Sequence, residues 1–210
     1  MLKAMSTTIA VSVSVVLTAF STAPAQAAGV ADFYKDRTMT VLVGFGAGGG
    51  YALYGRTLGQ HLGRHIPGNP KIILQFMPGA GGNKAANYFY KVSPRDGSVL
   101  SHLSNSAALQ QVLRPERIRY DVSKLSYLGR MVSMRSSLIV WHTSPATTLA
   151  DFKKKTLIFG ATGRAGQDYM NPTLMKNVLG FKVKVVTGYK GSRAINNAME
   201  KGEVHAMANS

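Results

Sequence analysis

The chain has 210 residues, of which 45% are apolar and 16% charged, and it contains no cysteine. This composition is that of a globular protein, because enough apolar surface is available to offset the entropy of the chain. The lack of cysteine excludes a disulfide scaffold, a thiolate metal site and a cysteine nucleophile. With 25 Lys and Arg against 9 Asp and Glu, the formal charge of +16 indicates an anionic partner, whether nucleic acid, membrane surface or small acids.

Residues 1–27 have the order of a secretory signal peptide. Lys3 precedes an apolar run over residues 9–20, and small residues follow up to a predicted cleavage site after Ala27. The apolar run is shorter than the roughly 20 residues that a membrane-spanning helix needs. We therefore expect a periplasmic protein, and this location argues against nucleic acid as the partner.

Beyond Arg37, short β-branched runs alternate with helical stretches, which is typical of parallel α/β units. In the first helical stretch the apolar residues Tyr54, Leu58, Leu62 and Ile66 recur at every fourth position. The expected strands are 38–45, 71–76, 98–103, 156–160, 181–187 and 203–208; the expected helices are 51–66, 83–92, 104–113, 149–155, 170–179 and 192–201. Two apolar stretches, 125–132 and 137–142, lie between the two halves of this pattern.

We predict two α/β lobes, residues 28–135 and residues 136–210. The last predicted strand has no following element to cover it. The second lobe, and a return of the chain to the first, are therefore expected to be incomplete.

Known catalytic motifs are absent from the sequence. There is no Gly-x-Ser-x-Gly nucleophile elbow. His61 and His65 have the spacing of a metal pair, but no glutamate or third ligand accompanies them, which favours solvated histidines on a helix face. The sequence thus predicts neither an enzyme nor a metal or cofactor.

Glycine-rich turns recur where predicted strands lead into helices. The first backbone N–H groups of a helix lack partners, and the macrodipole adds about half a positive charge there, so such turns can seat anions without a lysine. No acidic residue lies between Asp36 and Asp96, whereas seven Lys and Arg residues do. Several such turns together predict an anion-binding cleft.

A nicotinamide dinucleotide is one alternative for this anion. The Gly44-x-Gly46-x-x-Gly49 pattern matches the dinucleotide fingerprint but lacks the acid expected about 20 residues later. The turn 160–166 has the Gly-x-x-Gly-x-x-Gly spacing of short-chain reductases, with Arg164 as a candidate for a 2′-phosphate. An NADP-dependent reductase and a charge-driven nucleic-acid binder therefore stand as alternative hypotheses.

An ordered set of motifs resembles one family. The motifs read VGFGAGGGY at 43–51, MPGAGGN at 77–83, AANY at 85–88, PRDG at 94–97, FGATG at 159–163, GYKGS at 188–192 and GEV at 202–204. Together with the signal peptide they are similar to the substrate-binding proteins of tripartite tricarboxylate transporters, the Bug family.

The resemblance implies a type II periplasmic-binding-protein fold whose two lobes close on a small organic acid, without catalysis. It also implies membrane transporter subunits as partners and a monomeric state. By resemblance, the ligand-binding residues are Gly46, Gly48, Gly49, Gly50, Tyr51, Pro78, Gly79, Ala80, Gly81, Gly82, Ser104, Asn105, Thr162, Gly163 and Tyr189. Relatives continue beyond the length of this chain, so we expect it to be C-terminally truncated.

One departure from the family concerns the ligand. Many relatives carry an acid two positions after the glycine triplet. In this chain the triplet is Gly48-Gly49-Gly50, Tyr51 follows it, and the position of the acid is occupied by Ala52. A ligand ammonium group would find no counter-charge there, and burying it unpaired is costly. The sequence therefore predicts that amino acids bind more weakly than matching acids without an amine.

Overall fold

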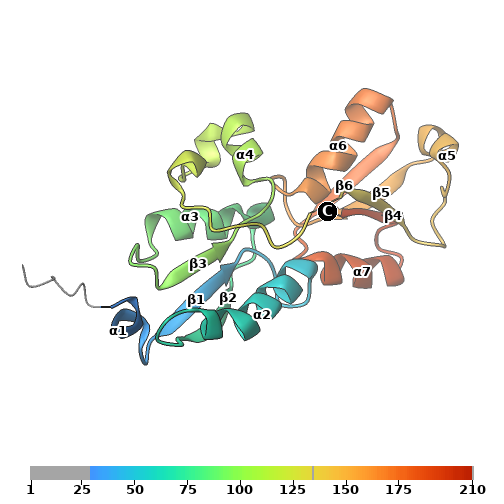
Figure 1. The fold of residues 1–210 in the computed structure, drawn as a ribbon. Helices are drawn as coiled ribbons and strands as arrows, with labels where there is room; N and C mark the ends of the chain where they lie inside the picture. The colour runs from blue at the N-terminus through green and yellow to red at the C-terminus, as the bar shows by residue number, and fades with distance from the viewer. Residues whose placement is uncertain (1–28, 134, 210) are drawn as a thin grey trace, which may run out of the picture.

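The computed structural model describes residues 29–133 and 135–209, which build two separate sheets. The first sheet has the strand order β2-β1-β3 and the second the order β4-β7-β5-β6. Figure 1 shows each sheet with its own helices, and the two sets side by side. We call them the first lobe and the second lobe. The predicted α/β class is confirmed, whereas the predicted signal peptide lies outside the described residues.

The first lobe is built on β1 (Thr38–Val43), which pairs in parallel with β2 (Lys71–Phe76) on one side and β3 (Val99–His102) on the other. The chain passes from β1 to β2 through α2 (Gly50–Leu62), and back across β1 to β3 through α3 (Asn83–Lys91). Because such crossovers are right-handed, the two helices cover opposite faces of the sheet, as Figure 1 shows.

In the second lobe, β5 (Leu157–Ala161) pairs in parallel with β6 (Val183–Thr187) and β7 (Ala206–Asn209). Strand β4 (Ser137–Val140) pairs with β7 in the antiparallel sense. Helix α6 (Gln167–Leu179) leads from β5 to β6, and α7 (Ser192–Glu200) leads from β6 to β7.

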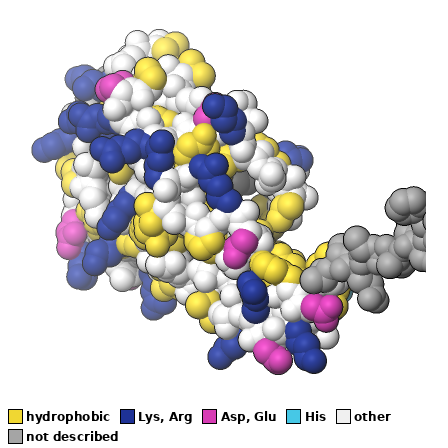
Figure 2. Space-filling model, turned by 90° about the vertical axis from the view of Figure 1, so that its left-hand side faces the viewer, with side chains coloured by type: hydrophobic (Ala, Val, Ile, Leu, Met, Phe, Trp, Pro, Cys, Tyr) yellow, Lys and Arg dark blue, Asp and Glu magenta, His cyan; other side chains and the backbone are white. Residues whose placement is uncertain are grey.

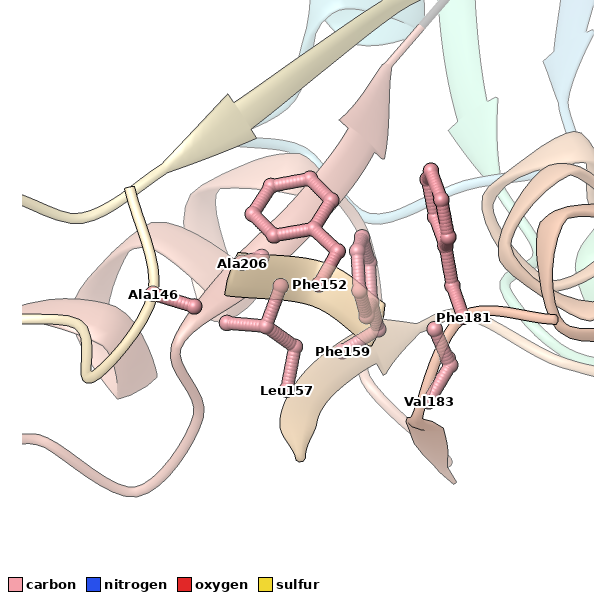
Figure 3. Close-up of a cluster of buried hydrophobic side chains, with 7 residues drawn as sticks. All are labelled: Ala146, Phe152, Leu157, Phe159, Phe181, Val183 and Ala206. Carbon is pink, nitrogen blue, oxygen red and sulfur yellow. The ribbon is translucent and has the colours of Figure 1, made fainter. Parts of the chain in front are cut away.

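The core of the second lobe contains one aromatic pair and a third buried ring. Phe152 and Phe181 meet edge to face, with ring centroids 5.5 Å apart, and Phe159 is fully buried beside them. Figure 3 shows these rings gathered over β5 with smaller apolar side chains around them. This packing makes the second lobe a rigid support for the loops at the ends of its strands.

Smaller elements complete the chain. These are α1 (Val30–Tyr34), α4 (Ala107–Leu113), α5 (Leu149–Lys154) and the 3₁₀ turns Gly63–His65, Ala80–Gly82, Pro115–Arg117 and Val122–Lys124. Helix α1 has no counterpart in the prediction. The predicted helix 51–66 ends as an α-helix at Leu62, and its last turn is the 3₁₀ turn. Of the two apolar stretches, the second contains β4, whereas Tyr127 and Leu128 in the first are largely exposed.

Candidate functional site

A cavity of about 90 Å³ lies between the two lobes, at the ends of their central strands. Parallel sheets bind ligands at the carboxyl ends of their strands, where the loops to the following helices gather. The lining residues are Phe45, Gly49, Gly50, Tyr51, Tyr54, His102, Ser104, Asn105, Val132, Thr162, Gly166, Gln167, Asp168, Gly191, Ser192, Ile195, Met207 and Ala208. Both lobes thus contribute to one small, largely apolar chamber.

Three helices begin at this cavity. Gly49, Gly166 and Gly191 are the N-cap residues of α2, α6 and α7, and none of them has a side chain that could cap the first turn. Each helix therefore directs the positive end of its dipole toward the chamber. The cavity attracts anions through backbone groups alone.

The starts of α2 and α7 lie against each other. The Gly50 N–H donates to the Ser192 hydroxyl at 3.4 Å, across the boundary between the lobes. A carboxylate at this point meets two helix dipoles instead of one. We call residues 49–51 and 191–192 the α2/α7 seat.

Aromatic rings form the wall of the chamber next to this seat. Phe45 and Tyr51 stack with ring centroids 4.1 Å apart, and the His102 ring lies at a tilt to the Tyr51 ring, with centroids 4.8 Å apart. The Tyr51 hydroxyl accepts the Asn105 N–H at 3.1 Å. Burial raises the pKa of Tyr51, and it lowers the pKa of His102 because a charged imidazole would lose solvation there. The wall is therefore uncharged at neutral pH.

Asp168 brings a carboxylate to the lining of the chamber. It lies in the first turn of α6, and its Oδ2 atom accepts the Thr162 N–H at 2.7 Å. Its Oδ1 atom is buried and has no hydrogen-bond partner among the described residues. Burial raises the pKa of Asp168, while the hydrogen bond from the Thr162 amide acts in the opposite direction.

Direct hydrogen bonds hold the two lobes together around the cavity. The Gly46 N–H donates to the Lys190 carbonyl at 2.6 Å, and the Ser106 hydroxyl donates to the Ala165 carbonyl at 2.7 Å. The side-chain amide of Asn105 donates from Nδ2 to Gln167 Oε1 at 2.7 Å. The loops of one lobe thus bind the loops of the other directly.

Six of the residues predicted by resemblance line the cavity: Gly49, Gly50, Tyr51, Ser104, Asn105 and Thr162. The other nine lie outside the lining: Gly46, Gly48, Pro78, Gly79, Ala80, Gly81, Gly82, Gly163 and Tyr189.

The positions of the outlying glycines have a physical reason. A Cβ atom at Gly163 would lie 2.6 Å from the Gly81 nitrogen, and one at Gly48 would lie 2.5 Å from the Arg193 side chain. These glycines therefore allow the lobes to touch, beside the chamber. Tyr189 packs against the apolar cluster that contains Ile195 and Met199.

Sequence reasoning missed several lining residues, above all Asp168, His102 and Ser192. A signal for Asp168 existed, because it stands two positions after the glycine turn at 163–166, in a chain with only nine acids. Ser192 lies within the motif GYKGS but was not among the predicted ligand-binding residues. His102 carries no comparable signal, since its role depends on how the two lobes meet.

The positive charge of the chain lies elsewhere. No Lys or Arg is among the described residues that line the cavity. Figure 2 shows Lys and Arg gathered on one outer face with few acids between them. A wider groove outside the cavity has five of them in its lining, Lys84, Arg114, Arg117, Arg119 and Arg164. Within residues 29–133 and 135–209, no helix has the length and apolarity to cross a membrane, and no cluster of three metal-ligating side chains occurs.

Comparison with known proteins gives matches among solved structures only; no family model and no curated protein matches the chain. A periplasmic transporter aligns with a TM-score of 0.74 at 22% identity, over 84% of this chain and 60% of its own. The periplasmic binding protein BugD aligns with a TM-score of 0.65 at 16% identity, over 84% of this chain and 60% of its own. MatC from Rhodopseudomonas palustris, with bound malate, aligns with a TM-score of 0.63 at 22% identity, over 82% of this chain and 60% of its own. The chain thus spans about 60% of the length of these structures, and the part described here has the α/β fold of periplasmic binding proteins.

Proposed function

We propose that this chain is a solute-binding component of a carboxylate importer, related to the Bug proteins of tripartite tricarboxylate transporters. It captures a small organic acid in the cavity between its lobes and delivers it to membrane subunits, without chemistry on the ligand. Residues 1–27 direct it to the periplasm, where it acts as a monomer. The observation that carries the proposal is the convergence of three helix starts with glycine N-caps on one cavity.

The α2/α7 seat supplies the physical basis for acid binding. Backbone N–H groups at helix starts bind a carboxylate through charge-assisted hydrogen bonds, which are stronger than those between neutral groups. The free-energy cost of removing the ligand's water shell is offset by the helix dipoles, which already point at the cavity. MatC, which shares the fold, has malate bound, and this supports an organic acid as the ligand here. Ser104, in the lining, offers a hydroxyl group for the rest of the molecule.

The reductase hypothesis finds no support in the turn 160–166. A Cβ atom at Gly160 would lie 2.6 Å from the Ile195 side chain, and Gly163 meets the backbone of Gly81. In a dinucleotide-binding turn, glycines leave room for the pyrophosphate to approach the backbone. Here the protein itself occupies that room.

A binding titration with a matched pair of variants tests the proposal. The ligands are propionate, succinate, malate, citrate and NADPH. Calorimetry measures the binding of each. A Cβ atom at Gly50 or at Gly129 meets nothing within 4 Å, so both positions accept a side chain. Gly50→Asp places a negative charge in the α2/α7 seat, whereas Gly129→Asp adds the same charge outside the cavity.

We expect at least one acid to bind the parent chain and Gly129→Asp alike, and to bind Gly50→Asp at least about tenfold more weakly, a difference of about 1.4 kcal/mol. Gly50→Asp should not melt earlier, because an acid in the first turn of a helix is favourable. Failure of every acid to bind, or equal binding by the two variants, would contradict the proposal. Binding of NADPH alone would replace it with the reductase hypothesis.

A further inference from the structure

The groove outside the cavity gathers positive charge that the cavity does not use. Its volume is about 640 Å³, and its lining contains Lys84, Arg114, Arg117, Arg119 and Arg164. The one acid in the described lining is Glu116, whose carboxylate lies 3.9 Å from Arg117 Nε. Both of these side chains are exposed, so water screens their attraction. We call this surface the basic groove.

The other four cations of the basic groove have no counter-charge in the protein. Lys84, Arg114, Arg119 and Arg164 form no ion pair among residues 29–133 and 135–209. Like charges around one groove repel one another, and together they raise the local concentration of anions. Such an arrangement does not stabilise the fold, whereas an anion that enters the groove meets several cations at once.

The segment that carries the first three arginines is held in place from two sides. The Asn87 side chain on α3 accepts the Arg119 N–H at 2.7 Å and donates to the Arg117 carbonyl at 3.3 Å. The hydroxyl of the buried Tyr120 donates to Asn83 Oδ1 at 3.1 Å. The charged side chains therefore extend from a fixed backbone, and a ligand has to order only the side chains themselves.

The floor of the basic groove is the contact between the lobes. Gln110 on α4 is buried, and its Nε2 atom donates to Met170 Sδ on α6 at 2.9 Å. Figure 1 shows these two helices facing each other across the boundary between the lobes. Gln110 and Ala165, which accepts the Ser106 hydroxyl, both line the groove. Arg164 comes from the second lobe and the other four cations from the first, so all five surround one groove only while the lobes touch.

The lining indicates which kind of anion fits. No aromatic residue is among the described residues of the groove, so a nucleotide base or single-stranded nucleic acid has no ring to stack on. The flat surface of a lipid bilayer cannot reach cations on both walls of a concave site. Four of the cations are exposed and spread along the groove instead of enclosing a single ion. Several carboxylates along an extended chain match this spread, and guanidinium groups bind carboxylates through two parallel hydrogen bonds.

We propose that the basic groove is a docking site for an acidic segment of a protein partner. The segment carries several Asp or Glu side chains and lies across the boundary between the lobes. Because Arg164 leaves the groove when the lobes separate, the partner recognises the protein with its lobes in contact. This inference rests on the proposed function only for the identity of the partner, which is then a membrane subunit of the importer.

A labelled hexaglutamate peptide with blocked ends tests the proposal. Fluorescence anisotropy measures its affinity for the parent chain and for two variants, Arg119→Glu in the first lobe and Arg164→Glu in the second. Lys71→Glu and Lys201→Glu are the matched controls, because both lysines are exposed and lie outside the groove and the cavity. All four substitutions change the net charge by the same amount.

We expect the parent chain and both lysine controls to bind the peptide with similar affinity. Each arginine variant should bind it at least about tenfold more weakly, because a negative charge then stands beside the ligand. Unlabelled hexaglutamate should displace the labelled peptide at lower concentration than tripolyphosphate or phosphatidylglycerol vesicles do. Circular dichroism checks the fold of each variant, and if one arginine variant does not fold, the other decides.

Two results would overturn the inference outright. One is that the parent chain does not bind the peptide, and the other is that arginine variants and lysine controls lose affinity equally, which would show attraction to net charge alone. Displacement at lower concentration by tripolyphosphate would replace the acidic segment with a phosphate ligand, and displacement by the vesicles would replace it with a membrane surface.

The proposed function fails or stands separately. Calorimetry of acid binding tests it in the cavity, whose lining contains neither Arg119 nor Arg164. If the acids bind but the peptide does not, the inference about the groove is wrong and the proposed function stands. If the peptide binds as expected but no acid does, the docking site stands and the proposed function is overturned.

Discussion

His102 lies at the end of β3, where its ring contacts the Tyr51 ring inside the cavity. Desolvation lowers its pKa, and a backbone hydrogen bond with Tyr51 offsets this only in part. Its Nδ1 atom is buried without a partner among the described residues. Protonation would therefore place an unpaired charge next to an aromatic wall.

This burial makes the stability of the fold depend on pH. The unfolded chain protonates this histidine near its ordinary pKa of about 6.5, whereas the folded chain does so only at a lower pH. Between these two values the unfolded state binds more protons, so the free energy of unfolding falls as the pH falls. His102→Gln removes this contribution, and its melting temperature should drop less than that of the parent chain between pH 7 and pH 5.

Thermal unfolding followed by circular dichroism at several pH values checks this expectation. His61→Gln is the control, since His61 is exposed on α2 and its replacement should leave the pH dependence unchanged. An unchanged slope in His102→Gln would show that this side chain does not carry the effect.

Among the elements, α5 shows how a short helix is fixed by its first residues. Thr148 accepts the Asp151 N–H at 3.2 Å, and the Asp151 carboxylate accepts the Thr148 N–H at 3.3 Å. This reciprocal capping box satisfies one orphan donor at each position. The buried Phe152 then follows at the position that joins the aromatic core.

Removing the cap should loosen this support. Thr148→Ala is expected to lower the free energy of unfolding by about 1 kcal/mol, because a helix N–H loses its acceptor. Thr147→Ala changes an exposed neighbour and should have little effect. Urea unfolding of both variants measures the difference, and equal midpoints would contradict the role assigned to the cap.

Elements whose signal is local could be predicted from the sequence. The β-branched runs gave β1, β2, β5 and β6 to within a few residues, and Gly180 ends α6 in the left-handed conformation as a C-cap. The end of α2 could not be predicted, because Gly63 lies against the Pro70 carbonyl and this contact forms only in the folded chain. Helix α1 is too short for a periodic signal.

The same limit applies to the site. Residues in the loops after β1 and β5 were indicated by glycine turns and by resemblance, and several of them line the cavity. Which glycines face the cavity and which face the other lobe depends on contacts between distant segments, such as Gly50 with Ser192. No pattern within either segment contains that information. His102 therefore emerged only from the structure, and Asp168 was indicated by nothing more than its place after a glycine turn.

For the whole molecule, the contact between the lobes depends on glycines that leave no room for a side chain. A Cβ atom at Gly163 would lie 2.6 Å from the Gly81 nitrogen and 2.9 Å from the Ala80 carbonyl carbon, and backbone atoms cannot move aside cheaply. Gly163 has no left-handed backbone conformation, so alanine there creates a clash without backbone strain.

Gly163→Ala should therefore separate the lobes while leaving each sheet intact. Overpacking of this kind costs about 1–3 kcal/mol, and we expect ligand affinity to fall by a corresponding factor. Small-angle scattering should show a larger radius of gyration, while circular dichroism stays unchanged. Gly129→Ala, at a position with open space around it, should match the parent chain. An identical scattering curve for the two variants would contradict the prediction.

The place of β7 in the second sheet has a consequence for folding. Residues 206–209 lie between β4 and β5, so β4 at residues 137–140 has no neighbour in the sheet until β7 joins it. Closing this long loop is slow, because chain entropy must be given up before the paired strands compensate it. During that interval the edges of β4 and β5 stay open to other chains. Folding of the second lobe is therefore the step at which this protein is most exposed to aggregation. The first lobe can form earlier, because its paired strands are separated by fewer residues than β4 and β7.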